Sequence, residues 1–315
     1  EAAVALLDDP ARVLAWFAAA DPQTGAGAVA YVSALLAQGR PADAETQAIR
    51  AWSTLSFTPD EAGALAALLP DSVALATETR LDTLLWDGRT DQAERLLPTV
   101  SADLAALAAA RIGLQTGAQG VTALIEAVPE TRAGDAGLAH DRFIWRMKKD
   151  LYDDALTLIL DRSTSAQSLG RPEAWADRRA VLARWLLRKG RASEAYRVAA
   201  SHHLTEGQDF IDLEFLAGFI ALRQLQDPAT ALDHFRHLET GVSTPISIAR
   251  AKYWQGRAEE ALGQDATASF TAAAAHQTAF YGLMAAERLG LSLDPALLSA
   301  ARVPDWQGAA FRQSS

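Results

Sequence analysis

Few residues of this sequence could do acid–base or metal chemistry, and its six histidines come first. His202 and His203 are adjacent, while His234 and His237 stand three residues apart. Residues three apart share one face of a helix, so the second pair could begin a metal site. The sequence places no third ligand beside either pair. We therefore interpret these four histidines as polar surface residues and predict no metal site.

Paired carboxylates are the other candidates for general acid–base work, and they occur at Asp8–Asp9, Asp153–Asp154 and Glu259–Glu260. Acidic residues at helix ends and on polar faces assist solvation, and near an N-terminus they interact favourably with the helix dipole. The sequence has no cysteine and no P-loop, GxSxG or HExxH motif, nor a GxGxxG that follows a strand. We predict no catalytic residue and no cofactor in this chain.

Eight tryptophans could stack on sugar rings or anchor a partner. Most lie among apolar residues at helical spacing, so we interpret them as core residues. For Trp254 and Trp306 the sequence does not decide between a buried and an exposed position. The full set is Trp16, Trp52, Trp86, Trp145, Trp175, Trp185, Trp254 and Trp306.

The charge of the chain argues against nucleic acids and anionic membranes as partners. The formal net charge is −10, with 39 acidic and 29 basic residues and no basic run. No apolar stretch reaches about 18 residues, the length needed to span a bilayer. Two groups of basic residues are interpreted as solvated helix faces. They are Arg142, Arg146, Lys148 and Lys149, and Arg178, Arg179, Arg184, Arg188 and Lys189.

The elements that must carry these residues are helices. Half of the residues are hydrophobic, and alanine, the best helix former, dominates them. Prolines such as Pro41, Pro59 and Pro172 stand where helices should begin, and apolar residues recur between them at helical spacing. The pattern predicts roughly eighteen short helices joined by short turns, and therefore antiparallel neighbours.

An internal repeat organises these helices. A turn residue, usually glycine, is followed five residues later by an alanine on the next helix, because a left-handed turn ends one helix and a small residue lets the next approach closely. We predict one continuous repeat domain over 1–315, with joints near 117–120 and 132–137. The six copies are Gly39–Ala44, Gly88–Ala93, Asp150–Ala155, Gly190–Ala195, Gln226–Ala231 and Gly263–Ala268.

Two segments near the C-terminus resemble the helical region of the soluble lytic murein transglycosylases. In that family a YW-x-GRA-x-x-x-LG element precedes an FYG-x-x-AA-x-x-LG element. The first element is matched by Tyr253, Trp254, Gly256, Arg257, Ala258, Leu262 and Gly263. The second is matched by Phe280, Tyr281, Gly282, Ala285, Ala286, Leu289 and Gly290. The stretches 80–89 and 170–179 also resemble members of the family.

The resemblance implies an N-terminal superhelical domain (U- and L-type) of a larger periplasmic enzyme. Its expected fold is an all-α, right-handed superhelix of TPR-like hairpins, which could curve into a ring or horseshoe. In that family a following lysozyme-like domain cleaves the MurNAc–GlcNAc bond and forms a 1,6-anhydro product. Its glutamate lies in a Glu-Ser element, and this sequence contains no Glu-Ser dipeptide. We therefore expect the catalytic glutamate beyond Ser315, on a domain that this chain would carry.

Three hypotheses for function remain at this point. The chain is the non-catalytic scaffold of a lytic transglycosylase, with its own catalytic domain and also peptidoglycan or cell-wall proteins as partners. Alternatively, it is a free-standing, TPR-like scaffold that binds proteins through its concave face. The third hypothesis, a complete enzyme with an unrecognised site, is disfavoured by the lack of clustered catalytic or metal-binding residues. Glu1 opens directly on a helical pattern, so we expect a processed or trimmed chain.

Overall fold

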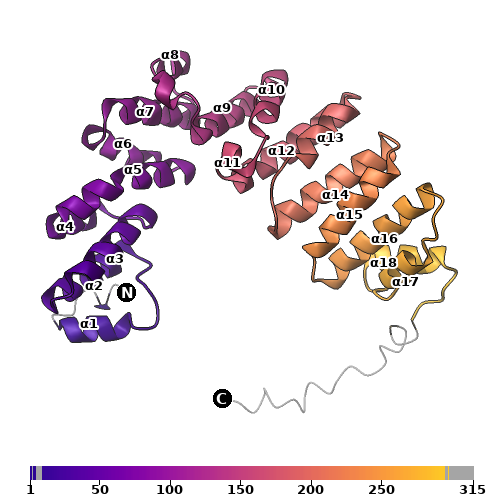
Figure 1. Ribbon diagram of the computed structural model, residues 1–315, viewed down its shortest axis with the longest axis horizontal. Helices are drawn as coiled ribbons and strands as arrows, with labels where there is room; N and C mark the ends of the chain where they lie inside the picture. Colours follow the sequence, from indigo (N-terminus) through magenta and orange to yellow (C-terminus); the bar gives the residue numbers. More distant parts are fainter. Residues whose placement is uncertain (2, 5–8, 295–296, 298–315) are drawn as a thin grey trace, which may run out of the picture. The chain divides into compact units, whose positions relative to one another are not determined.

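The regular structure of the protein is entirely helical, which confirms the predicted all-α fold (Figure 1). The computed structural model describes residues 1, 3–4, 9–294 and 297. Within these residues there are eighteen α-helices and no β-strand. Successive helices contact one another in the runs α1 to α3, α4 to α8 and α11 to α18, and short connections of this kind favour antiparallel neighbours. None of the helices in the described ranges is long and apolar enough to cross a bilayer.

The helices fall into two compact units, residues 1–145 and residues from 146 onward. The division lies within α9. Of the predicted joints, 117–120 is a loop of the first unit, and 132–137 runs from the end of a 3-10 turn into the start of α9. The first unit begins with α1 (Pro10–Trp16), α2 (Gly25–Ala37), α3 (Pro41–Thr54), α4 (Pro59–Leu68), α5 (Pro70–Trp86) and α6 (Thr90–Leu96). It continues with the 3-10 turn η2 (Leu97–Thr99), α7 (Ala102–Thr116), α8 (Val121–Glu126), the 3-10 turn η3 (Glu130–Arg132) and α9 (Ala136–Lys148).

In the second unit the later helices form a regular stack (Figure 1). Each contacts the next, and α12 with α14 and α16 with α18 are also in contact, which is the pattern of helical hairpins laid side by side. The helices are α10 (Tyr152–Arg162), α11 (Ala166–Leu169), α12 (Pro172–Arg188), α13 (Ala192–Ala200), α14 (Gly207–Arg223), α15 (Pro228–Thr240), α16 (Pro245–Ala261), α17 (Thr267–Ala274) and α18 (Phe280–Arg288).

The turns of the predicted repeat have the expected backbone. All six turn positions are left-handed, with φ near 70° at the glycines and 59° and 54° at Asp150 and Gln226. After Gly39 the amide of Arg40 donates to the carbonyl of Leu35, the long bond of a Schellman turn, at 2.9 Å. Glycine reaches this region without strain, whereas a side chain there has a cost. The turn signal in the sequence was therefore correct even where glycine is missing.

The alanine of the repeat is buried in five copies and exposed in the sixth. In five hairpins it is the fourth residue of the second helix and is fully buried, as at Ala44 and Ala195. After Gly263 the connection is two residues longer, and α17 begins only at Thr267. The fourth position of α17 is therefore Phe270, which is buried, and the prediction for Ala268 is wrong.

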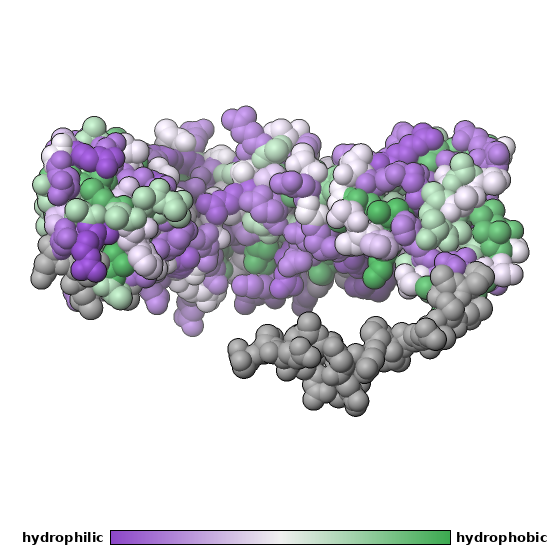
Figure 2. Space-filling model, turned by 90° about the horizontal axis from the view of Figure 1, so that it is seen from below, coloured by the Kyte–Doolittle hydropathy of each residue, from purple (hydrophilic) through white to green (hydrophobic). Residues whose placement is uncertain are grey.

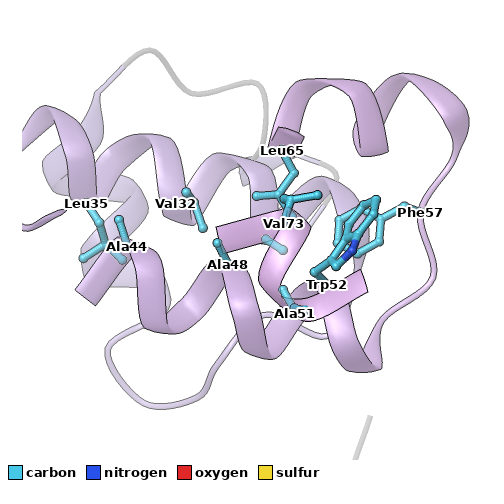
Figure 3. Close-up of a cluster of buried hydrophobic side chains, with 11 residues drawn as sticks. Val32, Leu35, Ala44, Ala48, Ala51, Trp52, Phe57, Leu65 and Val73 are labelled. Atoms are coloured by element: carbon cyan, nitrogen blue, oxygen red, sulfur yellow. The ribbon is translucent and has the colours of Figure 1, made fainter. Parts of the chain in front are cut away.

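Small and large apolar residues alternate in the core of the first unit (Figure 3). Val32 and Leu35 of α2 face Ala44 and Ala48 of α3, where the alanines allow close approach. The ring of Trp52 packs against Phe57 at the other end, with centroids 5.5 Å apart. On the face shown in Figure 2, hydrophilic residues are interspersed with smaller hydrophobic patches.

Two buried arginines hold neighbouring helices together without a carboxylate in ion-pair distance within the described chain. Arg179 of α12 donates to the carbonyl of Val198 at 2.7 Å and to the hydroxyls of Ser163 and Ser201. Its guanidinium thus meets the C-terminal ends of α10 and α13, which carry partial negative charge. Burial lowers the pKa of Arg179 to about 9. In the first unit, the Arg80 guanidinium likewise meets the C-terminal end of α3, where it donates to the carbonyls of Trp52 and Leu55.

We predict that Arg179→Ala destabilises the second unit by about 3 kcal/mol or more, because it leaves a cavity and buried acceptors without donors. The neighbouring Arg178 is exposed on the same helix, so Arg178→Ala should change stability by no more than about 0.5 kcal/mol. Urea unfolding followed by circular dichroism measures both. Equal effects of the two variants would contradict the assigned role of Arg179.

Candidate functional site

The two family-like segments pack directly on one another. Tyr253 and Trp254 lie on α16, and Tyr281 lies on α18. The Tyr253 and Tyr281 rings are 5.4 Å apart, and Phe270 of α17 lies 5.7 Å from Tyr253. The segments therefore form one aromatic cluster across three helices. Sequence matching had placed them only in order along the chain.

The glycines of these segments allow close contacts that any larger residue would block. A Cβ on Gly256 would lie 2.8 Å from the Phe270 ring, which explains how α17 can carry phenylalanine where other hairpins carry alanine. A Cβ on Gly282 would lie 2.0 Å from the carbonyl oxygen of His276. Gly263 and Gly290 have left-handed φ values of 70° and 66° and end their helices.

The remaining matched residues are also mainly structural. Ala258 and Ala286 are buried, and Arg257 lies 3.5 Å from Glu260 and 3.4 Å from the Tyr253 hydroxyl. Phe280 differs, because 67% of its surface is exposed. Packing thus accounts for every matched residue named here except Phe280.

The carboxylate pairs have structural partners. Asp9 caps α1 by accepting from the amide of Ala11, while Asp8 lies outside the described residues. Asp153 pairs with Arg191, and Glu260 pairs with Arg288 at the end of α16. These contacts agree with the interpretation of the pairs as helix-end charges.

The tryptophans are mostly packed. Trp52 and Trp175 are buried, and Trp86, Trp145, Trp185 and Trp254 are partly buried. Trp254 lies among the rings of Phe215, Phe219 and Phe235. Trp16 is the one that is clearly exposed within the described chain, at 60%, and Trp306 lies outside that part.

The second basic group does not form one face. Arg178, Arg184, Arg188 and Lys189 are exposed on α12, but Arg179 points into the core. The prediction that Arg179 belongs to a solvated face is therefore wrong. The reason is geometric: on a 3.6-residue helix Arg179 falls in line with the buried Trp175, Leu182 and Leu186.

A group of titratable residues surrounds Glu214, which the sequence analysis did not select. Glu214 is only 4% exposed and sits in the middle of α14. Its Oε1 lies 3.0 Å from His202 Nε2 and 2.9 Å from His237 Nδ1. Its Oε2 lies 2.6 Å from His234 Nδ1. The interpretation as polar surface residues is wrong for His202, which is buried, and for His234, which is largely buried. It holds for His237, which is exposed, but the same buried carboxylate joins all three.

Three elements position this Glu214 cluster, which consists of Glu214, His202, His234 and His237. His202 lies in the connection after α13, while His234 and His237 project from one face of α15, three residues apart. The Phe210 ring, one turn before Glu214, contacts His202 and His237 edge-on, with centroids 5.9 Å and 4.8 Å away. The cluster thus links two successive hairpins.

One signal in the sequence could have revealed the carboxylate. Glu214 falls on the apolar stripe of α14 that contains Phe210, Ala217 and Ala221, all of them buried. A carboxylate in such a stripe requires a buried partner. The partners themselves come from residues 12 to 23 positions away and could not be assigned by spacing.

The hydrogen bonds define the chemistry of His202. Its Nδ1 accepts from the amide of Leu204 at 2.9 Å, so its proton is on Nε2, which donates to Glu214. A metal ion bound to His202 Nε2 would require the ring proton on Nδ1. That proton would then face the N–H of Leu204, so two donors would oppose each other. Within the described residues, no group of three or more histidine, aspartate and glutamate side chains is arranged to hold a metal ion.

The cluster is also unsuited to nucleophilic or general-acid catalysis. Burial raises the pKa of Glu214, but hydrogen bonds from His202 and His234 outweigh this effect and lower the pKa to about 2. The Tyr196 hydroxyl lies 3.1 Å from His234 Nε2, yet burial and the charges of Asp227 and Glu214 raise the pKa of Tyr196. A general acid needs a raised carboxyl pKa and a nucleophile a lowered one, which is the reverse of this arrangement.

No protein-family model matches the chain, and no curated protein is significantly similar to it in sequence. The resemblance to the soluble lytic murein transglycosylases therefore rests on the motif segments of the sequence itself.

We predict that Gly282→Ala destabilises the second unit by about 2–3 kcal/mol, since the new methyl group meets backbone atoms that cannot move aside. Gly63 is a matched control, because it is exposed in α4 with no atom within 4 Å of the Cβ position. Gly63→Ala should stabilise by up to about 1 kcal/mol through helix propensity. Thermal unfolding of the two variants separates these effects, and a neutral Gly282→Ala would refute the close contact.

Glu214→Gln should cost about 3 kcal/mol near neutral pH, because it removes the buried charge that the histidines face. The pKa of Glu214 in the folded chain, about 2, is below its ordinary value of 4.5. Its ionised form therefore stabilises the fold fully above pH 4.5, and this contribution is lost as the pH falls towards 2.

The difference between wild type and Glu214→Gln should accordingly shrink between pH 4.5 and 2, as measured by urea unfolding at several pH values. Glu287→Gln, at an exposed position on α18, serves as the control and should show a small difference throughout. A wild-type–variant difference that does not change with pH would contradict the lowered pKa of Glu214.

Proposed function

We propose that this chain is a non-catalytic superhelical scaffold of a periplasmic peptidoglycan lytic transglycosylase. In this proposal it carries a catalytic domain whose glutamate cleaves glycan strands. The single observation that supports it is the packing of the two family-like segments, Tyr253–Gly263 and Phe280–Gly290, into one aromatic and glycine-lined cluster. Both segments would then be retained because they pack against each other, as a structural scaffold requires.

The roles of the motif residues also support a scaffold. Gly256 makes room for Phe270, and Gly282 lets the start of α18 approach the backbone of His276. These contacts set the geometry of the last hairpin and leave no reactive group at its centre. A segment with such a role would fix the direction in which the chain continues after α18.

The charge of the chain suits a frame better than a tight glycan receptor. Peptidoglycan carries peptide carboxylates, which a chain of net charge −10 repels on average. We therefore propose weak affinity of the chain alone for sacculi. The catalytic domain would supply the specific contacts with the glycan.

A free-standing, TPR-like protein-binding scaffold is the second candidate. The observation in its favour is the repeat of left-handed turns at six positions, since stacked hairpins of this kind commonly present an extended binding surface. This candidate does not depend on the motif segments near the C-terminus.

The purified 315-residue chain should release no 1,6-anhydro-muropeptides from sacculi, and its retention on sacculi should be weak and lost with added salt. Release of anhydro products by the chain alone would overturn the non-catalytic assignment, and tight, salt-insensitive retention would overturn the weak glycan affinity.

The reading frame of the gene separates the two candidates. A Glu-Ser element within roughly 100–150 residues after Ser315, the size of one further domain, supports the transglycosylase scaffold. A stop codon directly after Ser315 overturns it in favour of the free-standing scaffold.

A further inference from the structure

The three imidazoles around Glu214 differ in what their second ring nitrogen meets. His202 Nδ1 accepts a hydrogen bond from the amide of Leu204. The His202 ring therefore cannot gain a proton on Nδ1 without losing this hydrogen bond. His234 Nε2 faces the Tyr196 hydroxyl at 3.1 Å, and a hydroxyl can either donate or accept. The His237 side chain is 55% exposed, so solvent can accept its second N–H.

Two of the three histidines can therefore take up a proton with every hydrogen bond to Glu214 preserved. With neutral imidazoles the cluster holds one uncompensated negative charge in a largely buried place. One added proton makes the cluster neutral, and a second gives it a net charge of +1. Hydrogen bonds between an imidazolium and a carboxylate are shorter and stronger than those of a neutral imidazole. Imidazole changes its charge between about pH 5 and 8, within the physiological range.

The charged groups on the surrounding elements have partners of their own. Arg179 of α12 is bound by the Val198 carbonyl and two serine hydroxyls, and on α15 Glu239 is paired with Lys252 of α16. Arg250 of α16 pairs with Asp212 of α14. The other titratable groups on α13 to α15 are Glu194, Tyr196 and Arg197 of α13, Asp209 and Arg223 of α14, and Asp233 and Arg236 of α15. Glu206 and Asp227 lie at the N-caps of α14 and α15. Within the described chain, the ion-pair partners of Glu214 are the three histidines.

The cluster acts on the connection between two hairpins. Residues 201–206 join α13 to α14 without helical structure. His202 ties this connection to Glu214, and the next residue, His203, ties it to the carbonyl of Ser163 at 3.1 Å. His203 has a left-handed backbone, with φ of 56°, which directs the two adjacent rings to different partners. The two adjacent histidines thus bind the connection to α14 through Glu214 and to the end of α10 through Ser163.

We propose that Glu214 with His202, His234 and His237 is a pH-sensitive latch, which holds α15 to α14 more firmly at pH 5.5 than at pH 8. His202 remains the neutral donor of the latch, and His234 and His237 are its proton acceptors. The latch is a property of the helical stack and does not depend on the proposed scaffold function.

Amide hydrogen exchange of the intact chain tests the latch. Protection factors of α14 and α15, corrected for intrinsic exchange, should be roughly fivefold to tenfold higher at pH 5.5 than at pH 8, as expected for replacing neutral by charge-assisted bonds. The doubly substituted His234→Gln, His237→Gln chain should lose this difference. His276→Gln, outside the cluster, should retain it. Equal protection at the two pH values in wild type, or an unchanged difference in the double variant, overturns the latch.

A spectroscopic measurement keeps the test independent of how well the variants fold. Ring ¹⁵N shifts of the wild-type chain should show His202 as the neutral Nε2–H tautomer at both pH values, and His234 and His237 as charged only at pH 5.5. Protonation of His202 together with the other two rings, or its Nδ1–H tautomer, would overturn the assignment of roles.

Discussion

The left-handed turn between consecutive helices is the constraint on which the stack depends. It reverses the chain within a few residues and brings the fourth residue of the next helix into the core, where five hairpins have a fully buried alanine. Two turns lack glycine and bear the strain of a side chain at positive φ. Local hydrogen bonds offset it: Asp150 accepts from the Tyr152 hydroxyl, and Gln226 donates to the carbonyl of Arg223.

Arg80, Arg179 and Glu214 illustrate two ways in which polar groups buried between helices are satisfied. Arg80 and Arg179 are surrounded by carbonyl and hydroxyl oxygens at helix ends, so their compensation is dipolar and independent of pH. Glu214 is surrounded by imidazoles, whose charge depends on pH. Both arrangements link elements that are distant in sequence, and both would be costly to leave unpaired. The charge of the Glu214 cluster can therefore change with the pH of its surroundings.

In the family-like segments, the motif residues have packing roles and no catalytic role. Gly256 is small because the Phe270 ring lies against it, and the longer connection after Gly263 is what brings Phe270 to that place. The strongest shift of a carboxyl pKa, at Glu214, is caused by partners within the helical stack. These features together support the proposal of a scaffold whose chemistry, if any, is carried elsewhere.

The sequence by itself determined the helical class, the turn positions and the small residues of five hairpins, because these depend on local backbone preferences and on spacing along one helix. It was wrong at Ala268, since two extra residues in the connection shifted the buried position to Phe270. It was wrong for Arg179, where the residue type suggested solvent and the helical register placed the side chain in the core. Only the tertiary structure decided the Glu214 cluster. Its members come from three elements, and contacts between elements depend on how helices pack, which spacing along the chain does not specify.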